Sequence, residues 1–273
     1  MSVFRTRFAP SPTYYLHLGH AASALHVWRA AKAAGGDVLL RIEDIDTTRC
    51  KPEYTAAIFE DLRWLGLDWP EPVRVQSDHF DAYRACVSAL QARGLAYRCF
   101  RSRSELATLP VPSQPGPHAA NEERILLERD VPFAWRLSLA AAREALGTDW
   151  GKLSYRVSKG RKVQTPKAEP ERHGDIVIAR KDSPSAYHLA ATYDDAFQAM
   201  THIVRGEDLI DAPHIQTLLQ VLMEWPQPVY QHHPLIVDED GKKLSKRQRS
   251  ISLASLRADG MTAEQIRRRL GFK

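Results

Sequence analysis

The sequence predicts an α/β protein built on a doubly wound parallel sheet. A strand-like run near the N-terminus is followed by a helical run and then by "DVLLRIED" (37–44), a nearly continuous apolar stretch typical of a buried parallel strand. Strand, helix and strand in this order form a βαβ unit, and the pattern then repeats. We therefore expect a Rossmann-type fold, with an inserted α+β subdomain and a short helical C-terminal segment.

The first half of the Rossmann domain is assigned to residues 1–100. "VFRTRFAP" reads as the first strand and Gly19–Ala34 as the first helix, which Gly35 ends as a C-cap glycine. Apolar residues at helical spacing predict two further helices, at 54–67 and 79–95, with the short strand "VRVQS" between them.

The inserted subdomain is assigned to residues 101–185. It begins with the proline-rich loop "VPSQPGPHAANEE" and continues with short strand-like runs, among them "FAWRLSL", "LSYRVS" and "GDIVIAR". "THIVRGEDLI" then resumes a core strand, which places the second half of the Rossmann domain at 186–250. Residues 251–273 are expected to form the C-terminal helical segment.

Composition narrows the class of protein. The chain is 44% hydrophobic and 26% charged, and its N-terminus has no apolar stretch like that of a signal peptide. No apolar run is long enough for a membrane helix, so we expect no membrane partner. The net charge of +5 does not by itself indicate nucleic acid, and the basic runs near the C-terminus could be ordinary solvated surface. Three scattered cysteines without CxxC spacing favour a reducing, cytoplasmic location.

The loop before the first helix is a candidate anion site. It lies at the carboxyl edge of the sheet, where α/β proteins bind ligands, and the free N–H groups of a helix start favour negative charge. His17 and His20 could donate to phosphates there, while Gly19 permits a close approach of the backbone. The two histidines could instead cap the helix. A zinc pair is disfavoured because the i, i+4 spacing is absent.

A second candidate phosphate site is "GKKLSK" (241–246). Its three lysines follow a glycine, and cationic side chains on a loop suit a triphosphate because they can follow charge onto a leaving pyrophosphate. The glycine-rich Walker sequence is absent, so an ordinary P-loop enzyme is not indicated.

These motifs together resemble the class I aminoacyl-tRNA synthetases. "RFAPSPT…LHLGH" and "KLSKR" are similar to the paired HIGH and KMSKS motifs, and "RIEDID" with "VRGEDLI" point to the glutamyl branch. The resemblance covers nearly the whole chain and implies that the insertion at 101–185 is an acceptor-like subdomain. It implies that the α-carboxylate of glutamate attacks the α-phosphorus of ATP, with Mg²⁺ accompanying ATP and no protein cage for the metal. It assigns ATP binding to His17, Gly19, His20, Lys243 and Lys246, with His17, His20 and Lys246 as the catalytic residues.

The same resemblance implies a pocket for glutamate, formed by Arg7, Ala9, Ser11, Glu43, Tyr187 and Arg205. Two arginines can each bind one carboxylate of the substrate through two parallel hydrogen bonds, and Glu43 can bind its ammonium group. The sequence does not say which arginine binds which carboxylate. Without the neighbouring motifs, Glu43 could be a solvated acidic turn and Tyr187 a core aromatic residue.

The length favours one member of the branch. A compact body of 273 residues has a radius of gyration of roughly 18 Å, too small to touch both the acceptor end and the anticodon of one tRNA. The chain is similar to the glutamyl-queuosine tRNA(Asp) synthetase family, whose members attach glutamate to queuosine at the wobble position. This implies a monomer that binds the anticodon stem-loop of tRNA(Asp). A minimal glutamyl-tRNA synthetase core and an RNA- or nucleotide-binding paralogue without catalysis stay open.

Two positions depart from the family pattern. Tyr14 stands where members usually have glycine, and a tyrosine resists positive φ and fills space near the substrates. Many members also bind zinc in the inserted subdomain through a C-x-C pair and later Tyr and Cys ligands. Here Cys99 is followed by Arg101 at the second position, and no cysteine comes later. One thiolate cannot make a structural zinc site, so no zinc is expected.

Overall fold

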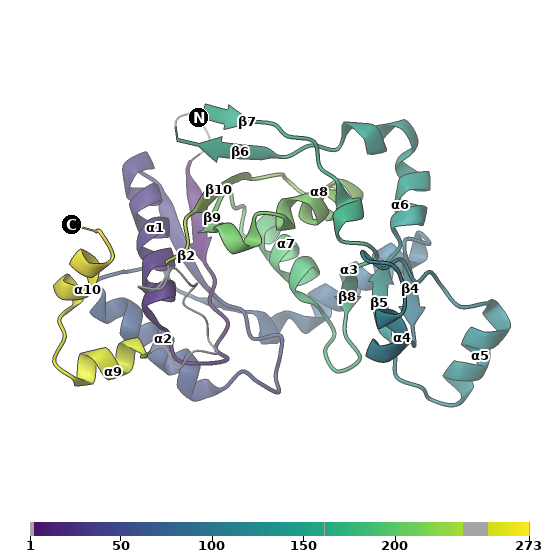
Figure 1. The fold of residues 1–273 in the computed structure, drawn as a ribbon, viewed down its shortest axis with the longest axis horizontal. Coiled ribbons are helices and arrows are strands. Elements are labelled where there is room, and N and C mark those ends of the chain that lie inside the picture. Colours follow the sequence, from purple (N-terminus) through teal and green to yellow (C-terminus); the bar gives the residue numbers. More distant parts are fainter. Residues whose placement is uncertain (1–2, 161, 237–250, 273) are drawn as a thin grey trace.

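The computed structural model describes residues 3–160, 162–236 and 251–272 of the chain. The predicted parallel sheet is confirmed at its N-terminal half, where β1 (Arg5–Phe8), β2 (Asp37–Ile42) and β3 (Arg74–Val75) pair in parallel (Figure 1). A glycine is required just before β2. A Cβ on Gly36 would lie 2.1 Å from the carbonyl oxygen of Phe4, so only glycine lets the two strands start side by side.

The helices of this half lie close to their predicted positions. They are α1 (Leu18–Ala34), α2 (Pro52–Trp64) and α3 (Phe80–Ala92). Helix α1 ends at Gly35, which has a φ of 61° and donates its N–H to the last turn, as a C-cap glycine does. The apolar face of α1 packs with β2 and α2 in one core cluster.

The second half of the sheet lies directly beside β1. It contains β9 (His202–Gly206) and β10 (Val229–His233), which pair in parallel, with α7 (Tyr187–Phe197) before β9 and α8 (Ala212–Leu222) after it. The N–H of Thr201 donates to the carbonyl oxygen of Arg5 at 3.0 Å and joins the two halves. Because the chain continues from β1 and β9 to opposite sides, ligands are expected at their carboxyl ends.

The inserted region has a sheet of its own, with β5 antiparallel to both β4 and β8. Its elements are β4 (Ala96–Cys99), α4 (Arg103–Ala107), α5 (Ala120–Glu128), β5 (Ala134–Leu137), α6 (Leu139–Leu146) and β8 (Val177–Ala179). One hairpin expected here belongs elsewhere. Strand β6 (Arg156–Lys159), paired with β7 (Lys162–Gln164), runs parallel to β10 and extends the main sheet. This pairing covers an edge of β10 that would otherwise be open.

The C-terminal segment is helical as predicted and contains two short helices, α9 (Leu253–Ala258) and α10 (Ala263–Arg269). The break falls at Gly260, whose φ is +83°. Arg257 of α9 forms ion pairs with Glu60 and Asp61 of α2 and holds the segment against the sheet domain. Within the described ranges, no helix has the length and apolar character needed to cross a membrane.

Candidate active site

A cavity of about 460 Å³ opens at the carboxyl ends of β1 and β9. Every described residue that the sequence assigned to glutamate or ATP lines it: Arg7, Ala9, Ser11, His17, Gly19, His20, Glu43, Tyr187 and Arg205. Lys243 and Lys246 lie outside the described residues. The cavity therefore brings together residues from β1 and its following loop, α1, the end of β2, α7 and β9.

The two histidines of the opening motif cap helix α1. The Nδ1 atom of His17 accepts the N–H of Gly19 at 3.0 Å, and the N–H of His17 donates to Nδ1 of His20 at 3.2 Å. The rings lie 3.9 Å apart between centroids. Both interpretations of the pair are compatible with this geometry, since capping uses the Nδ1 atoms while both residues line the cavity.

Gly19 is required by the fold of this cap. A Cβ at Gly19 would lie 2.8 Å from Cε1 of His17, because the imidazole bends back over the first turn of the helix. Gly206, at the end of β9, is constrained in a similar way, since a Cβ there would lie 2.5 Å from an oxygen of Asp208 and 2.8 Å from Leu235. A side chain at either position would require these neighbouring side chains of the cavity lining to move.

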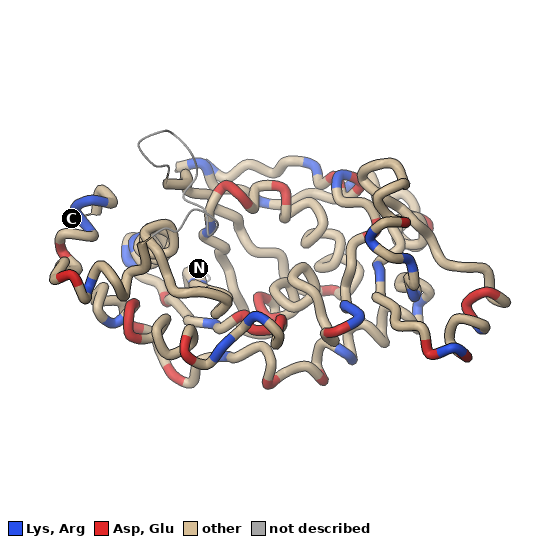
Figure 2. The backbone as a smooth tube through the Cα atoms, turned by 60° about the horizontal axis from the view of Figure 1, so that its bottom comes forward, with Lys and Arg blue, Asp and Glu red and all other residues tan. Residues whose placement is uncertain are grey.

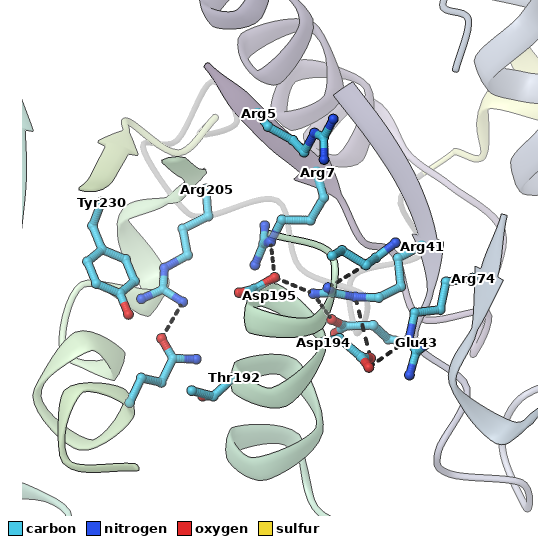
Figure 3. Close-up of polar contacts among 12 residues, drawn as sticks. Arg5, Arg7, Arg41, Glu43, Arg74, Thr192, Asp194, Asp195, Arg205 and Tyr230 are labelled. Carbon is cyan, nitrogen blue, oxygen red and sulfur yellow. Dashed lines mark hydrogen bonds and ion pairs between the residues drawn. The ribbon is translucent and has the colours of Figure 1, made fainter. Parts of the chain in front are cut away.

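Arg7 and Glu43 are held through a shared pair of buried charges (Figure 3). Nε of Arg7 donates to Oδ1 of Asp195 at 2.8 Å, and Nη2 of Arg41 donates to the same oxygen at 2.9 Å. Nη2 of Arg41 also donates to Oε1 of Glu43 at 3.1 Å. The fully buried Arg41 therefore links the cation and the anion that the sequence assigned to the glutamate pocket.

Burial and the neighbouring arginines have opposite effects on the pKa of each of two carboxyl groups, those of Asp195 and Glu43. Burial would raise the pKa of Asp195, but Arg7 and Arg41 hold the pKa of that carboxyl below its usual value. Burial raises the pKa of Glu43, and Arg41 and Arg7 only partly oppose the rise. Asp195 is thus a firmly ionised partner for the arginines, while Glu43 is a carboxylate whose charge a substrate ammonium would stabilise.

A second acid, Asp194, lies behind this group and does not line the cavity. Its oxygens accept from Nε of Arg74 at 2.7 Å, Nε2 of Gln76 at 2.8 Å and Oη of Tyr83 at 2.8 Å. The carboxyl group is fully buried and joins β3 and α3 to α7. Asp194 therefore fixes the helix that carries Asp195.

Arg205 is buried on β9 among neutral groups. Nη1 donates to Oε1 of Gln216 at 3.1 Å, Nε points to Nε2 of His232 at 3.4 Å, and the guanidinium lies 5.0 Å from the ring centroid of Tyr230. Burial first, and then Arg205 itself, lower the pKa of His232 to about 4, so this imidazole is neutral. Among the described residues no carboxylate pairs with Arg205, and its buried Nη2 has no hydrogen-bond partner.

Tyr187 is the first residue of α7 and lies on the cavity wall. Burial raises the pKa of Tyr187, so its hydroxyl stays protonated and can donate a hydrogen bond to a ligand. The sequence assigned Tyr187 to the pocket but missed Asp195 and Arg41. The signal was the adjacent pair "DD" in the otherwise apolar helix that Tyr187 begins, because buried acids need cationic partners.

The conformation of Tyr14 bears on its departure from the family pattern. The described non-glycine residues with positive φ are Asp130, Ala199 and Glu224, so Tyr14 has an ordinary backbone conformation. Its side chain is 53% exposed and does not line the cavity. The ordinary backbone agrees with the expectation that a tyrosine resists a positive φ, and the ring lies outside the cavity lining. The effect of Tyr14 on the substrates stays a prediction.

The inserted subdomain has no metal-binding group within the described residues, where no cluster of three or more His, Cys, Asp or Glu side chains could hold an ion. At the second position of the former C-x-C pair, Nη1 of Arg101 donates to the carbonyl oxygen of Gly116 at 3.0 Å. This contact joins the end of β4 to the proline-rich loop. That the protein binds no zinc stays a prediction.

Comparison with known proteins identifies the relatives of this fold and site. The family model "tRNA synthetases class I (E and Q), catalytic domain" matches residues 3–124 and 160–272. A "Glutamyl-Q tRNA(Asp) synthetase" of Rhodobacter capsulatus is 41% identical over 98% of this chain and 99% of its own length. A "Glutamate--tRNA ligase" of Synechococcus sp. (strain CC9902) is 38% identical over 96% of this chain, which spans 56% of that relative.

Solved structures give the same picture. A glutamate tRNA ligase from Elizabethkingia meningosepticum, solved in complex with its amino acid, matches 90% of this chain with a TM-score of 0.71 and 29% identity. The match covers 52% of that ligase. The methionyl-tRNA synthetase of Mycobacterium tuberculosis has a TM-score of 0.58 at 13% identity, which shows a shared fold.

Proposed function

The chain belongs to the class I tRNA synthetases for glutamate and glutamine, and on that basis we propose that it activates L-glutamate with ATP and transfers it to queuosine at the wobble position of tRNA(Asp). It is a ligase of the aminoacyl-tRNA synthetase type. Activation of glutamate and its transfer to tRNA follow from the family. We propose in addition that the acceptor is queuosine and that the residues of the cavity bind the substrates.

The observation that carries the proposal is the unbalanced charge of Arg205. A buried guanidinium without an anionic partner is costly, and a carboxylate entering the cavity would supply the missing charge and a partner for Nη2. Arg7, on the neighbouring strand, lines the same cavity (Figure 3). The charged residues that line the cavity are Arg7, Arg205, Glu43 and Asp208. The two arginines can each bind a carboxylate of a dicarboxylate, and an acid can take its ammonium group.

The proposed activation needs no nucleophilic side chain. A carboxylate oxygen of glutamate bonds to the α-phosphorus of ATP, the bond from that phosphorus to the bridging oxygen breaks, and pyrophosphate leaves with the electron pair. His17, Gly19 and His20 at the start of α1 bind the phosphates, with the positive end of the helix toward them. Lys243 and Lys246 are assigned to the leaving pyrophosphate by their motif, and Mg²⁺ would enter with ATP.

The proposed transfer forms an ester. A hydroxyl oxygen of the cyclopentene diol of queuosine bonds to the acyl carbon of glutamyl-adenylate, and the bond from that carbon to the phosphate oxygen breaks. AMP leaves with the electron pair, and the hydroxyl proton is released to AMP or to solvent. The glutamyl-Q relatives support this acceptor because they match along most of their own length, 99% and 84% in two cases. The charging enzymes are matched over 56% of theirs. We propose that the protein acts as a monomer on the anticodon stem-loop.

Activation is tested by ATP–pyrophosphate exchange without RNA. We expect exchange that depends on glutamate, with glutamine a poor substrate because it lacks the second carboxylate charge. Efficient exchange with glutamine would contradict the pocket assignment. No exchange with any amino acid would favour a binding paralogue that has lost catalysis.

The acceptor is tested with labelled glutamate and three forms of tRNA(Asp). We expect a base-labile product on tRNA that carries queuosine, and none on the same tRNA with guanosine at that position. Removal of the 3′-terminal adenosine should leave the queuosine product unchanged. Labelling that requires the terminal adenosine and ignores queuosine would instead identify a minimal glutamyl-tRNA synthetase core.

A further inference from the structure

Three tyrosines gather on the surface beside the cavity. Tyr14 and Tyr15, in the loop before α1, are 53% and 44% exposed. Both rings lie close to Tyr54 of α2, with centroids 6.3 Å and 5.0 Å away. The ammonium group of Lys51 lies 5.6 Å from the centroid of Tyr54. We call Tyr14, Tyr15 and Tyr54 the tyrosine platform.

The platform is held by ordered backbone. The N–H of Thr13 donates to the carbonyl oxygen of Ser11 at 2.9 Å, and the N–H of Lys51 donates to that of Pro12 at 3.1 Å. The two segments that carry the rings are thus joined before any ligand arrives. Large aromatic side chains that are exposed together and held in place are typical of binding surfaces.

The platform lies next to the site. Tyr14 and Tyr15 fall between Ser11 and His17, which both line the cavity. Three residues of extended chain span roughly 10 Å at most, so Tyr14 is within that reach of the cavity wall at either end. A ligand that stacks on the platform would be adjacent to the reacting groups.

A cationic cavity of about 560 Å³ lies on the side of the inserted subdomain. Its basic lining residues are Arg101, Arg103, Arg136, Arg180 and Lys181, and Asp182 is its acidic one. Segment 45–51 connects this cavity to the platform, because Arg180 forms an ion pair with Asp46 at 3.2 Å and Ser183 donates to the carbonyl oxygen of Ile45 at 2.8 Å. Figure 2 shows basic and acidic residues interspersed over the backbone of the molecule.

We propose that the tyrosine platform stacks an unpaired base of an RNA loop, while the cationic cavity binds phosphates of the same RNA. Every base has a π face, but only an unpaired, unstacked base can offer it to a tyrosine ring. The platform therefore fits a loop better than a duplex stem, and the cations fit the backbone that enters and leaves the loop. This inference rests on the proposed function for the identity of the loop, that of the anticodon.

Stacking is tested by the affinity for a tRNA(Asp) anticodon stem-loop. Tyr15→Leu and Tyr54→Leu are each expected to weaken binding roughly fivefold to a hundredfold, because stacking on one ring is lost. Tyr15→Phe and Tyr54→Phe keep the ring and should bind like the wild type. As a matched control, Phe197→Leu removes an aromatic side chain that is 63% exposed at the far end of α7 and should leave binding unchanged.

Salt dependence separates the two parts of the surface. The leucine variants of the platform should keep the wild-type slope of log affinity against log salt, because stacking releases no counterions. Arg103→Gln and Lys181→Gln should each reduce the slope by roughly 0.7–0.9. Glutamate-dependent exchange without RNA should stay within about twofold in the leucine variants, which verifies their fold.

An acceptor-stem minihelix, measured in parallel, separates this inference from the proposed function. If the wild type binds only the minihelix and the leucine variants weaken that binding, the platform is supported and the anticodon assignment is overturned. If the leucine variants bind either RNA as the wild type does, or if the wild type binds neither, the platform is refuted. Equal loss in the phenylalanine and leucine variants would also refute stacking.

Discussion

Buried arginines occur in two neighbouring regions of this protein, and their charge is balanced differently. Around Asp194 and Asp195, the guanidinium groups of Arg41 and Arg74 pair with carboxylates of α7 at 2.7–2.9 Å. Around Arg205 the partners are an amide, a neutral imidazole and an aromatic ring, and within the described residues no carboxylate forms an ion pair with it.

This difference separates a framework from a binding surface. Charges that are compensated within the protein hold β1, β2 and β3 against α7, and any loss of one partner leaves another charge buried and unpaired. A buried charge without an internal ion-pair partner lowers the stability of the fold and is available to a ligand. Arg7 lies between the two types, since Asp195 pairs with its Nε while the residue lines the cavity.

The largest expected effect is on stability, from Asp194→Ala. The change leaves Arg74, Gln76 and Tyr83 without their common acceptor, so the free energy of unfolding should fall by about 3–5 kcal/mol in urea titrations. Asp81→Ala is the control, because that acid pairs with Arg84 at the surface and its side chain is 99% exposed. There the change should stay below about 1 kcal/mol. Equal effects of the two variants would remove the distinction between framework and surface charges.

The next effect is on substrate affinity, from Arg205→Gln. Loss of one partner from a buried charge pair costs about 2–5 kcal/mol, so the KM for glutamate in pyrophosphate exchange should rise by roughly 30-fold to several thousandfold. The loss of stability should be far smaller than in Asp194→Ala. Arg5→Gln is the control, because its side chain is 41% exposed and pairs with Asp37 at the surface. A normal KM with strongly reduced stability would place Arg205 in the framework.

The sequence predicted the cavity lining better than the support behind it. The lining residues lie in short motifs at the ends of strands and at the start of α1, where local pattern and topology together decide position. The contact of Arg7 with Asp195 joins residues 188 positions apart, and no local pattern indicates such a pairing. The absence of an acid at Arg205 is likewise a property of packing, which the sequence does not reveal.

The pairing of strands is likewise hard to predict from the sequence. The run "LSYRVS" was correctly predicted as a strand, but its partner was not, because its mixture of polar and apolar residues does not indicate which sheet the strand joins. Tyr155 decides the matter by packing edge to face against Tyr230 of β10, with centroids 6.0 Å apart. Long-range packing of this kind outweighs sequence proximity.

A smaller effect concerns the pH dependence of stability near Arg205. Burial lowers the pKa of both His188 and His232 to about 4, with help from His173 at the first and Arg205 at the second. An unfolded histidine titrates near about 6.5, so the unfolded state binds more protons between that pH and 4. The free energy of unfolding should therefore fall as pH falls through this window.

Variants test the origin of this slope. His232→Gln and His188→Gln should each reduce by up to one the number of protons taken up on unfolding. The free energy of unfolding, measured in urea titrations at several pH values, should then fall less steeply as pH falls. A slope that neither variant changes would mean that these histidines are already protonated beside Arg205 in the folded state. In that case the region would carry even more unbalanced positive charge than the structure indicates.

The smallest expected effect on activation is that of Tyr14→Gly, at a position that belongs to neither charged region. Strain relief is not available, because Tyr14 has no positive φ, and the exposed ring does not line the cavity. Glycine instead gives the unfolded chain more conformational freedom, which lowers the free energy of unfolding by up to about 1 kcal/mol. We therefore expect both KM values and kcat for exchange within about twofold of the wild type, while affinity for the stem-loop falls.

Tyr14→Ala separates the causes. A gain with Gly alone would reveal backbone strain, and equal gains with Gly and Ala would show that the ring obstructs the substrates. A loss of activation in both variants would instead make the tyrosine part of the catalytic cavity.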